Sequence, residues 1–243
     1  MSNQRKVLGI LGGLGPMASV YFYEMLTAHT KVTRDQEHLD IILNSRASTP
    51  DRTAFILGKS EDDPGEVLAR DAKMLEEAGA GAIAMPCNTA HRFYDRIEES
   101  INVPFVNMIK ETVCYCASKG AKKIGIMATD GTVLAKSYDG WCEKYGIETV
   151  VPEPASQAKV MSIIYDNIKK GIPADMCAFY AVADELRSKG CEKILLACTE
   201  LSLIKRAGGL DAKLFVDPME ILTLKCIKEC GGTPCGFEEL DYE

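Results

Sequence analysis

An internal repeat constrains the fold of this chain more than any other feature of its sequence. Residues 79–87 resemble residues 190–198 at an offset of 111 positions, and residues 103–107 resemble residues 213–217 at an offset of 110. Each match is weak by itself, but matches in one order at a nearly constant offset indicate a duplicated unit. We therefore expect two similar halves.

Each half alternates short apolar runs with longer amphipathic stretches. Residues 7–11 are typical of a buried strand that ends in the glycine-rich turn 12–15, and Pro16 is placed to open a helix. Strands that alternate with helices predict parallel sheets with helices on both faces. The expected fold class is α/β, with two similar doubly wound, Rossmann-like domains related by pseudo-twofold symmetry and the active site in the cleft between them.

The repeat also suggests domain boundaries. We assign residues 1–108 and 214–243 to the first α/β domain and residues 109–213 to the second, which gives both an ordinary domain size. This division expects the strand at residues 214–216 to return to the first half. It also expects the C-terminal segment to pack on the first domain.

The composition is that of a globular protein and excludes several classes. The chain has 243 residues, of which 47% are hydrophobic and 26% charged. Its formal net charge of −7 offers no basic surface, so we expect no nucleic-acid partner. The longest stretch without a charged side chain spans 17 residues, 7–23, whereas a membrane-spanning helix needs about 20. No secretory signal is recognisable, so we expect a cytoplasmic protein with no membrane partner.

Two of the ten cysteines are distinguished by their positions. Cys87 and Cys198 are equivalent in the repeat, and each directly follows an apolar run and begins a loop or helix. Ligands bind at the carboxyl ends of strands in sheets of this kind, so both cysteines are candidates for a site. The sequence has no CxxC motif, and the isolated pair Cys114 and Cys116 has no second pair at ligand spacing. We therefore expect no metal site.

Paired thiols at equivalent strand ends suit proton transfer at a carbon atom. A helix N-terminus stabilises a thiolate. If the halves face each other, one sulfur can take a proton from a bound molecule while the other returns one from the opposite side. Asn88, Thr89 and Thr199 are placed to donate hydrogen bonds to the charge that develops. Arg52 follows a strand in a polar segment and could bind a carboxylate, although a surface salt bridge explains it about as well.

Four segments resemble motifs of the cofactor-independent aspartate/glutamate racemases, in the expected order: residues 9–19, 50–54, 85–91 and 197–202. The paired Cys-Asn-Thr and Cys-Thr-Glu motifs are specific to that superfamily, and Pro-Asp-Arg-Thr at residues 50–53 is similar to aspartate racemases in particular. The resemblance covers the chain from about Lys6 to Asp217.

This resemblance implies a mechanism and a set of residues. Cys87 and Cys198 would be the two catalytic bases that interconvert L-aspartate and D-aspartate, with no pyridoxal phosphate or other cofactor. A family lysine maps best onto Lys169, with Lys170 as the neighbouring alternative. The protein would be a cytoplasmic homodimer acting on a small acidic amino acid. The expected substrate-binding residues are Met17, Arg52, Asn88, Thr89, Thr129, Lys169, Thr199 and Glu200.

Several alternatives stay open. Glutamate racemase, or another two-cysteine isomerase or decarboxylase of a small carboxylic acid, would use the same motifs. A nucleotide-dependent oxidoreductase is less well supported, because residues 13–18 fit G-x-G-x-x-A but the second strand ends in Asn44 rather than an acidic residue. An inactive small-acid binding protein is a further alternative. Arg46 lies near the motif and could alter side-chain preference. His91 could face the site or have a capping or core role.

Overall fold

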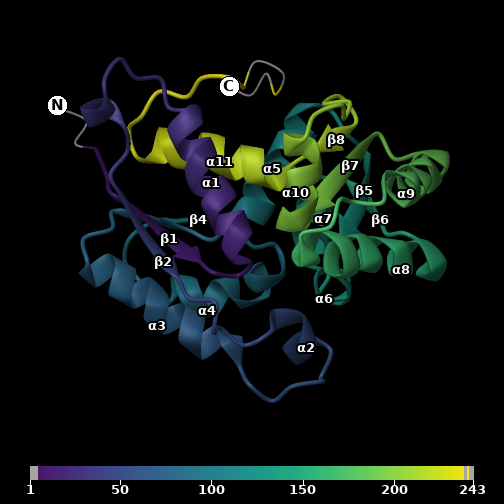
Figure 1. The fold of residues 1–243 in the computed structure, drawn as a ribbon, viewed down its shortest axis with the longest axis horizontal. Coiled ribbons are helices and arrows are strands. Elements are labelled where there is room, and N and C mark those ends of the chain that lie inside the picture. Colours follow the sequence, from purple (N-terminus) through teal and green to yellow (C-terminus); the bar gives the residue numbers. More distant parts are fainter. Residues whose placement is uncertain (1–4, 238–239, 241–243) are drawn as a thin grey trace.

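The structure, a computed structural model, describes residues 5–237 and residue 240. The chain forms two four-stranded sheets, which lie in the left and right parts of the molecule in Figure 1. Neighbouring strands in both sheets are parallel. The first sheet contains β1 (Leu8–Gly12), β2 (Ile41–Ser45), β3 (Ala82–Ala84) and β4 (Phe105–Val106), and the second contains β5 (Lys123–Ala128), β6 (Glu148–Val150), β7 (Lys193–Ala197) and β8 (Phe215–Val216).

The two sheets share one topology. Their strand orders are β2-β1-β3-β4 and β6-β5-β7-β8, so each strand of the second sheet takes the place of the strand four earlier. The duplication expected from the sequence is therefore present in the strand order. It gives β3 and β7, the strands that precede Cys87 and Cys198, equivalent interior positions.

Helices connect the strands. The larger ones are α1 (Pro16–Ala28), α3 (Pro64–Glu77), α5 (Met108–Ser118), α8 (Pro154–Ser162), α9 (Met176–Ser188), α10 (Thr199–Arg206) and α11 (Pro218–Glu229). Shorter ones are α2 (Arg52–Ile56), α4 (Tyr94–Glu98), α6 (Asp130–Leu134) and α7 (Asp139–Lys144), with 3₁₀ turns at Asp35–Glu37, Thr89–Phe93 and Ile168–Lys170 and a π-helical turn at Ile163–Asn167.

Local sequence explains where many helices begin. Helices α1, α3, α8 and α11 each start with a proline, whose fixed φ and missing N–H suit the first helical turn. Side-chain caps are also common. Asp63 accepts a hydrogen bond from the Gly65 N–H at the start of α3, and Asn107 accepts one from the Lys110 N–H at the start of α5.

Both faces of each sheet are covered, as the alternation of elements predicts. Leu8 and Ile10 of β1 pack with α1 and α11, whereas Leu11 packs with α3. In the second sheet, Ile126 packs with α5 and Met127 packs with α8 and α9. Because successive strand residues point to opposite faces, these separate clusters are the two sides of a doubly wound sheet.

The chain passes between the halves twice, and the second crossing differs from the expectation. The strand at residues 215–216 pairs with β7, so it belongs to the second sheet and does not return to the first. Its residues Phe215 and Val216 are buried in the clusters of the second half, which fixes this placement. The chain returns through α11, which packs beside α1 of the first half and α5 of the second (Figure 1). The boundary therefore follows Val216 rather than preceding Leu214.

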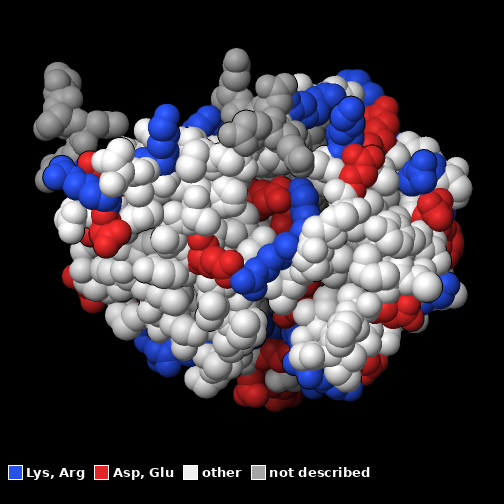
Figure 2. Space-filling model, turned by 45° about the horizontal axis from the view of Figure 1, so that its top comes forward, with Lys and Arg blue, Asp and Glu red and all other residues white. Residues whose placement is uncertain are grey.

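Among the described residues, no helix is long and apolar enough to cross a bilayer. On the face drawn in Figure 2, basic and acidic side chains are interspersed and do not gather into one basic patch.

Candidate active site

A small cavity lies where the carboxyl ends of the two sheets meet. It holds about 20 Å³, close to the space that one water molecule needs. The lining comes from loops after β1, β2, β3, β5 and β7 and from the segment that follows α8. The lining residues are Leu14, Asp51, Arg52, Thr53, Cys87, Asn88, Thr89, Thr129, Tyr165, Lys169, Cys198, Thr199 and Glu200.

Both repeat cysteines line this cavity, and each is contributed by a different half. Cys198 directly follows β7, and Cys87 follows β3 after two intervening residues. Each of these residues is 6% exposed. The equivalent strand ends thus bring two sulfurs to one enclosed space, although they are 111 positions apart in the sequence.

The thiol of Cys198 is bonded to a carboxylate. Cys198 is the N-cap of α10, and its Sγ donates a hydrogen bond to Glu200 Oε2 at 2.9 Å. The other oxygen, Oε1, lies 3.7 Å from Lys169 Nζ. Burial, followed by the neighbouring charge of Glu200, raises the pKa of the Cys198 thiol well above its ordinary value. Cys198 is therefore a thiol in this arrangement.

The backbone of Cys87 is held by a buried imidazole. His91 Nδ1 bonds the Cys87 carbonyl oxygen at 2.8 Å, and the Met108 N–H donates to His91 Nε2 at 3.1 Å. A carbonyl only accepts and an N–H only donates, so this pair of bonds requires a neutral ring protonated at Nδ1. Burial lowers the pKa of His91 to about 4, which agrees with a neutral ring. His91 is not among the residues that line the cavity, and it takes the capping and core role left open above.

Two donors beside the cavity are buried without a partner among the described residues. They are Nε of Arg52 and Nδ2 of Asn88. The rest of each side chain is fixed. One terminal nitrogen of Arg52 donates to the carbonyls of Thr49 and Pro50 at 3.2 and 3.0 Å, and Asn88 Oδ1 accepts from the Tyr138 hydroxyl. Buried donors are normally satisfied, so unpartnered ones at a cavity indicate a place for a ligand with hydrogen-bond acceptors.

Threonine hydroxyls join the halves at the cavity wall. Thr89 Oγ1 lies 3.0 Å from Thr129 Oγ1 and 2.9 Å from Thr132 Oγ1. The backbone of Gly131 also lies close to the first half at this point. A Cβ added to Gly131 would lie 2.9 Å from Thr53 Oγ1 and 3.1 Å from Thr89 Cγ2. These contacts belong to a closed arrangement of the halves, with little room for a side chain between them.

Comparison with known proteins agrees with this geometry. A family model for Asp/Glu/hydantoin racemases matches residues 11–226. The chain belongs to this family. The solved aspartate racemase of Picrophilus torridus is 30% identical, with a TM-score of 0.83 over 98% of this chain and 100% of that chain.

More distant relatives also match this chain. The broad specificity amino-acid racemase RacX of Bacillus subtilis is 25% identical over 201 residues, which are 82% of this chain and 87% of RacX. The glutamate racemase of Francisella tularensis, solved with D-glutamate, has the same fold at 18% identity, with a TM-score of 0.64 over 93% of this chain and 81% of that chain. The protein is thus a racemase of the Asp/Glu family.

All the substrate-binding residues expected for this racemase lie together at the cavity except Met17. Arg52, Asn88, Thr89, Thr129, Lys169, Thr199 and Glu200 all line it. Met17 is 61% exposed on the first turn of α1, and Leu14 of the preceding turn lines the cavity instead. Met17 is the second residue of α1 and its side chain faces solvent, whereas the neighbouring Ala18 and Ser19 are buried.

The structure also separates neighbouring basic residues. Lys169 lines the cavity, whereas Lys170 is exposed and pairs with Asp166 at 2.9 Å. Arg46 forms an ion pair with the buried carboxylate of Asp71, 2.5 Å from its Nε, and does not line the cavity. The position of Lys169 at the cavity agrees with the preferred alignment of the family lysine. Arg46 instead forms a structural ion pair with Asp71.

Sequence reasoning missed four lining residues. Leu14, Asp51 and Thr53 adjoin motif residues that were singled out, so a wider window around each motif would have included them. Tyr165 lies on the π-helical turn, and its ring centroid is 4.4 Å from Lys169 Nζ. Its spacing of four residues from Lys169, about one helical turn, was the available signal.

The glycine turn before α1 is filled by protein atoms. A Cβ added to Gly13 would lie 2.4 Å from the backbone carbon of Arg46, and one added to Gly15 would lie 3.0 Å from Glu200 Oε1. Both residues also have positive φ angles. The glycines therefore permit a tight turn and close packing against the site, which accounts for the G-x-G-x-x-A match without a dinucleotide.

Proposed function

We propose that this racemase interconverts L-aspartate and D-aspartate without pyridoxal phosphate, with Cys87 and Cys198 as the two bases. The observation that carries the proposal is that both sulfurs line one cavity from equivalent strand ends of the two halves. Opposed acid–base groups are what inversion at a carbon requires, because the proton must leave one face and return to the other.

In the proposed reaction, one cysteine thiolate removes the Cα proton and becomes a thiol. The bonding electrons stay on the substrate and are delocalised into its α-carboxylate. The other cysteine, as a thiol, then donates its proton to the opposite face of Cα and becomes a thiolate. In the reverse direction the two cysteines exchange these roles.

The unpartnered donors support an anionic substrate. Arg52 Nε and Asn88 Nδ2 can each complete a hydrogen bond to a carboxylate oxygen, and Lys169 adds a positive charge at the cavity. Donors that are already fixed in position stabilise developing negative charge without reorganising. An amino acid with two carboxylates uses all three groups.

Substrate entry requires the halves to separate. A cavity of about 20 Å³ cannot admit an amino acid. The contacts between Thr89 and the hydroxyls of Thr129 and Thr132 would have to open, since they join the two halves at the cavity wall. Closure then excludes water from the carbanion.

The preference for aspartate rests on the Pro-Asp-Arg-Thr motif and on similarity to the Picrophilus aspartate racemase over nearly the whole chain. Glutamate racemase, or another two-cysteine isomerase or decarboxylase, is the second candidate. It is favoured by relatives named glutamate racemase, such as one from Persephonella marina that is 29% identical over 140 residues. On the basis of the same resemblance, we also propose that the protein is a cytoplasmic homodimer.

One experiment decides between these substrates. Purified enzyme is incubated with L-aspartate, D-aspartate, L-glutamate or D-glutamate in D₂O, and Cα deuteration and chirality are followed by proton NMR and chiral chromatography. We expect deuterium at Cα and loss of optical purity with aspartate, both after dialysis against EDTA and after hydroxylamine treatment. Faster turnover of glutamate than of aspartate would show that glutamate, not aspartate, is the preferred substrate. Dependence on metal or pyridoxal would overturn the cofactor-free mechanism.

The cysteine variants test the mechanism itself. Cys87→Ser and Cys198→Ser should each lower racemisation by about 10²-fold or more, because each removes one of two acid–base groups. Cys177→Ser, at an exposed cysteine on α9 outside the cavity, is the matched control and should racemise at the parent rate. Racemisation at the parent rate by both active-site variants would rule out the two-thiol mechanism.

A further inference from the structure

The first helical connection differs between the two halves. In the first half, β1 is followed by the single helix α1, which has 13 residues. At the equivalent place after β5, the second half has two shorter helices, α6 and α7, with residues 135–138 between them. Lys136 in this break has a φ angle of 50° and is the single non-glycine residue with a positive φ in the described part of the chain. Such a conformation is unfavourable for a lysine, which indicates that the surroundings hold the path of the break.

The break places Tyr138 against the first half. Tyr138 is the N-cap of α7, and its ring packs in the apolar cluster that includes Val113 of α5 and Ile126 of β5. Its hydroxyl donates a hydrogen bond to Asn88 Oδ1 of the first half at 2.5 Å. Tyr138 and Asn88 are 1% and 3% exposed. The two halves are thus joined by a hydrogen bond in the interior, next to the cavity that Asn88 lines.

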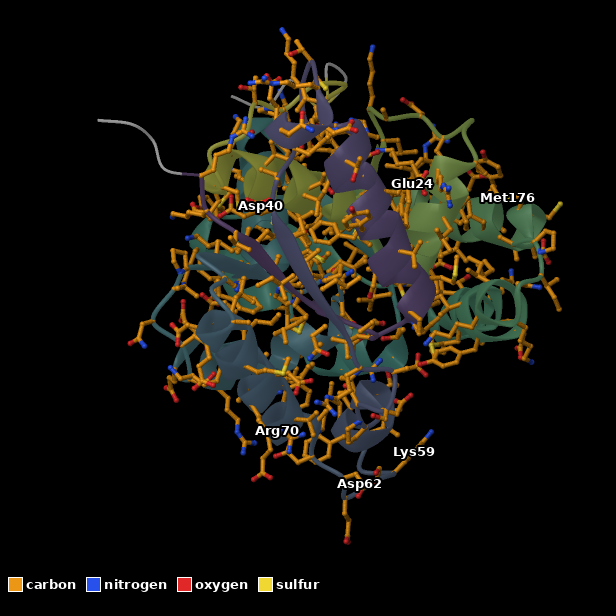
Figure 3. All side chains as sticks on the ribbon, turned by 60° about the vertical axis from the view of Figure 1, so that its left-hand side comes forward. Glu24, Asp40, Lys59, Asp62, Arg70 and Met176 are labelled. Carbon is orange, nitrogen blue, oxygen red and sulfur yellow. The ribbon has the colours of Figure 1, made fainter. Side chains whose placement is uncertain are left out.

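Other polar contacts also join the halves. The threonine hydroxyls at the cavity wall form one set, and the exterior ion pair between Glu24 of α1 and Arg206 of α10, 2.7 Å apart, is another (Figure 3). The Tyr138 bond differs from both because its partner has a second polar atom. Asn88 Nδ2 is buried and has no hydrogen-bond partner among the described residues. A donor that the fold leaves unsatisfied beside a cavity is available to a ligand.

The bond to Tyr138 decides which end of the Asn88 amide faces the cavity. The amide oxygen only accepts hydrogen bonds, and the amide nitrogen only donates them. Burial raises the pKa of the Tyr138 hydroxyl well above its ordinary value, so the hydroxyl keeps its proton and can donate it to Oδ1. With Oδ1 occupied in this way, Nδ2 is left for the cavity. The reversed amide would turn an oxygen towards a substrate carboxylate, which repels it.

We propose that Tyr138 is a positioning residue, whose hydroxyl binds Asn88 Oδ1 when the halves close and thereby directs the Asn88 N–H at the substrate. This inference rests on the proposed racemisation and on Asn88 as a substrate-binding residue. Without the bond, the amide can rotate about its terminal torsion, which is a soft one, and the donor is no longer fixed. Because the two residues belong to different halves, the donor is oriented only in the closed enzyme, where it stabilises negative charge without reorganising.

The first test removes the hydroxyl alone. Tyr138→Phe keeps the ring and its packing. We expect kcat/KM for aspartate to fall about tenfold or more, because a donor that is free to rotate stabilises the developing charge less well. Racemisation is followed by chiral chromatography, and Cα deuteration in D₂O is followed by NMR. An unchanged kcat/KM would overturn the proposal.

The second test asks whether the hydroxyl acts through the amide N–H or only by attaching the halves. In Asn88→Asp, a carboxylate still accepts from the Tyr138 hydroxyl, but no N–H faces the substrate. This variant should lose about 10²-fold or more in kcat/KM, the usual effect of removing one such donor. Tyr138→Phe added to Asn88→Asp should then change the remaining Cα exchange less than about twofold, because no donor is left to orient. A further loss as large as in the parent would overturn the proposal.

Two variants serve as controls. Tyr180→Phe removes the hydroxyl of an exposed tyrosine on α9, and Glu24→Gln weakens the exterior ion pair between the halves. Both should racemise within about twofold of the parent rate, since neither residue lines the cavity and exposed ion pairs contribute little. If Glu24→Gln lost as much activity as Tyr138→Phe, the hydroxyl would act by attaching the halves, which would contradict the proposal.

The outcomes distinguish this inference from the proposed function. If the parent enzyme neither racemises nor exchanges aspartate, the proposed function fails. If the parent racemises aspartate and Tyr138→Phe does so equally well, only the role of Tyr138 is overturned. Should Tyr138→Phe fail to fold, Asn88→Asp decides. Loss of its activity with parental thermal stability supports an oriented donor, whereas full activity shows that no donor is needed there and overturns the proposal.

Discussion

His91 fixes the backbone of Cys87 from outside the cavity: its Nδ1 lies 2.8 Å from the Cys87 carbonyl oxygen, while its Nε2 accepts from the Met108 N–H at the start of α5. One neutral imidazole thus joins the strand end that carries a proposed base to the helix that begins the second half. Protonation of this ring would convert its Nε2 acceptor into a donor facing an N–H.

This contact predicts how stability depends on pH. The pKa of His91 is lowered from 6.5 to about 4 in the folded protein. Between these values the unfolded chain binds a proton that the folded protein excludes, so stability falls as pH drops from about 6.5 to about 4, by about 3 kcal/mol. His91→Gln cannot titrate and should lose this component, although two weakened hydrogen bonds lower its stability at pH 7 by about 1–3 kcal/mol. Urea unfolding of both proteins across pH 4–8 measures the difference.

An opposite pH dependence is expected from Asp217. Burial, with a contribution from Glu220, raises the pKa of Asp217 from 3.8 to about 7. The folded protein then binds a proton that the unfolded chain releases, so this component of stability is lost as pH rises from about 4 to about 7. Asp217→Asn keeps an acceptor for the Ser202 hydroxyl and for the Met219 N–H, both on Oδ1. Relative to the parent, the variant should gain free energy of unfolding over that interval, and a constant difference from pH 4 to 8 would contradict this assignment.

The two adjacent lysines should differ sharply in function. Lys169→Ala removes a positive charge from the cavity and should raise the KM for aspartate by about tenfold or more, the usual effect of losing a charged hydrogen bond. Lys170→Ala removes an exposed ion pair with Asp166, four residues earlier, and should change KM less than about twofold. Steady-state kinetics on both variants test the comparison. Equal effects of the two substitutions would show that Lys169 is not the substrate-binding lysine.

Because Gly131 has no side chain, the two halves can approach each other closely at this position. Gly131→Ala adds a Cβ within 3.1 Å of Thr53 and Thr89 atoms of the first half, so full closure should be impeded and kcat/KM should fall about 10–100-fold. Gly140→Ala, in α7, meets no atom within 4 Å and should raise stability by roughly 0.5–1 kcal/mol without loss of activity. Kinetics and thermal unfolding of the pair measure both effects. An unimpaired Gly131→Ala enzyme would mean that turnover does not need this contact.

The sequence predicts the architecture and the centre of the site because both repeat. Matching segments at a nearly constant offset indicate two equivalent sheets, and they single out Cys87 and Cys198 among ten cysteines. Features that depend on contacts between distant segments are harder to predict. Arg46 pairs with Asp71, 25 positions away, and His91 finds its second partner at Met108, so neither role is visible in local spacing.

Local geometry accounts for the remaining differences. Met17 lies close to the cavity in sequence, but the helical turn directs its side chain to solvent. Tyr165 reaches the cavity on a π-helical turn; its spacing from Lys169 was the available signal, but the π-helical conformation itself leaves no mark in the sequence. The strand β8 has only two residues; the repeat matches it to β4, and the packing of Phe215 and Val216 places it in the second sheet.

The double passage of the chain between the halves has a mechanical consequence. The polypeptide crosses once before α5 and once before α11, and in each case a side chain caps the helix that follows, Asn107 for α5 and Asp217 for α11. Because a helix cap anchors each crossing, we expect the halves to bend about the line that joins the two crossings and to resist sliding and twisting. Opening and closing would then follow a single path, which would return both sulfurs to the same separation after every substrate molecule.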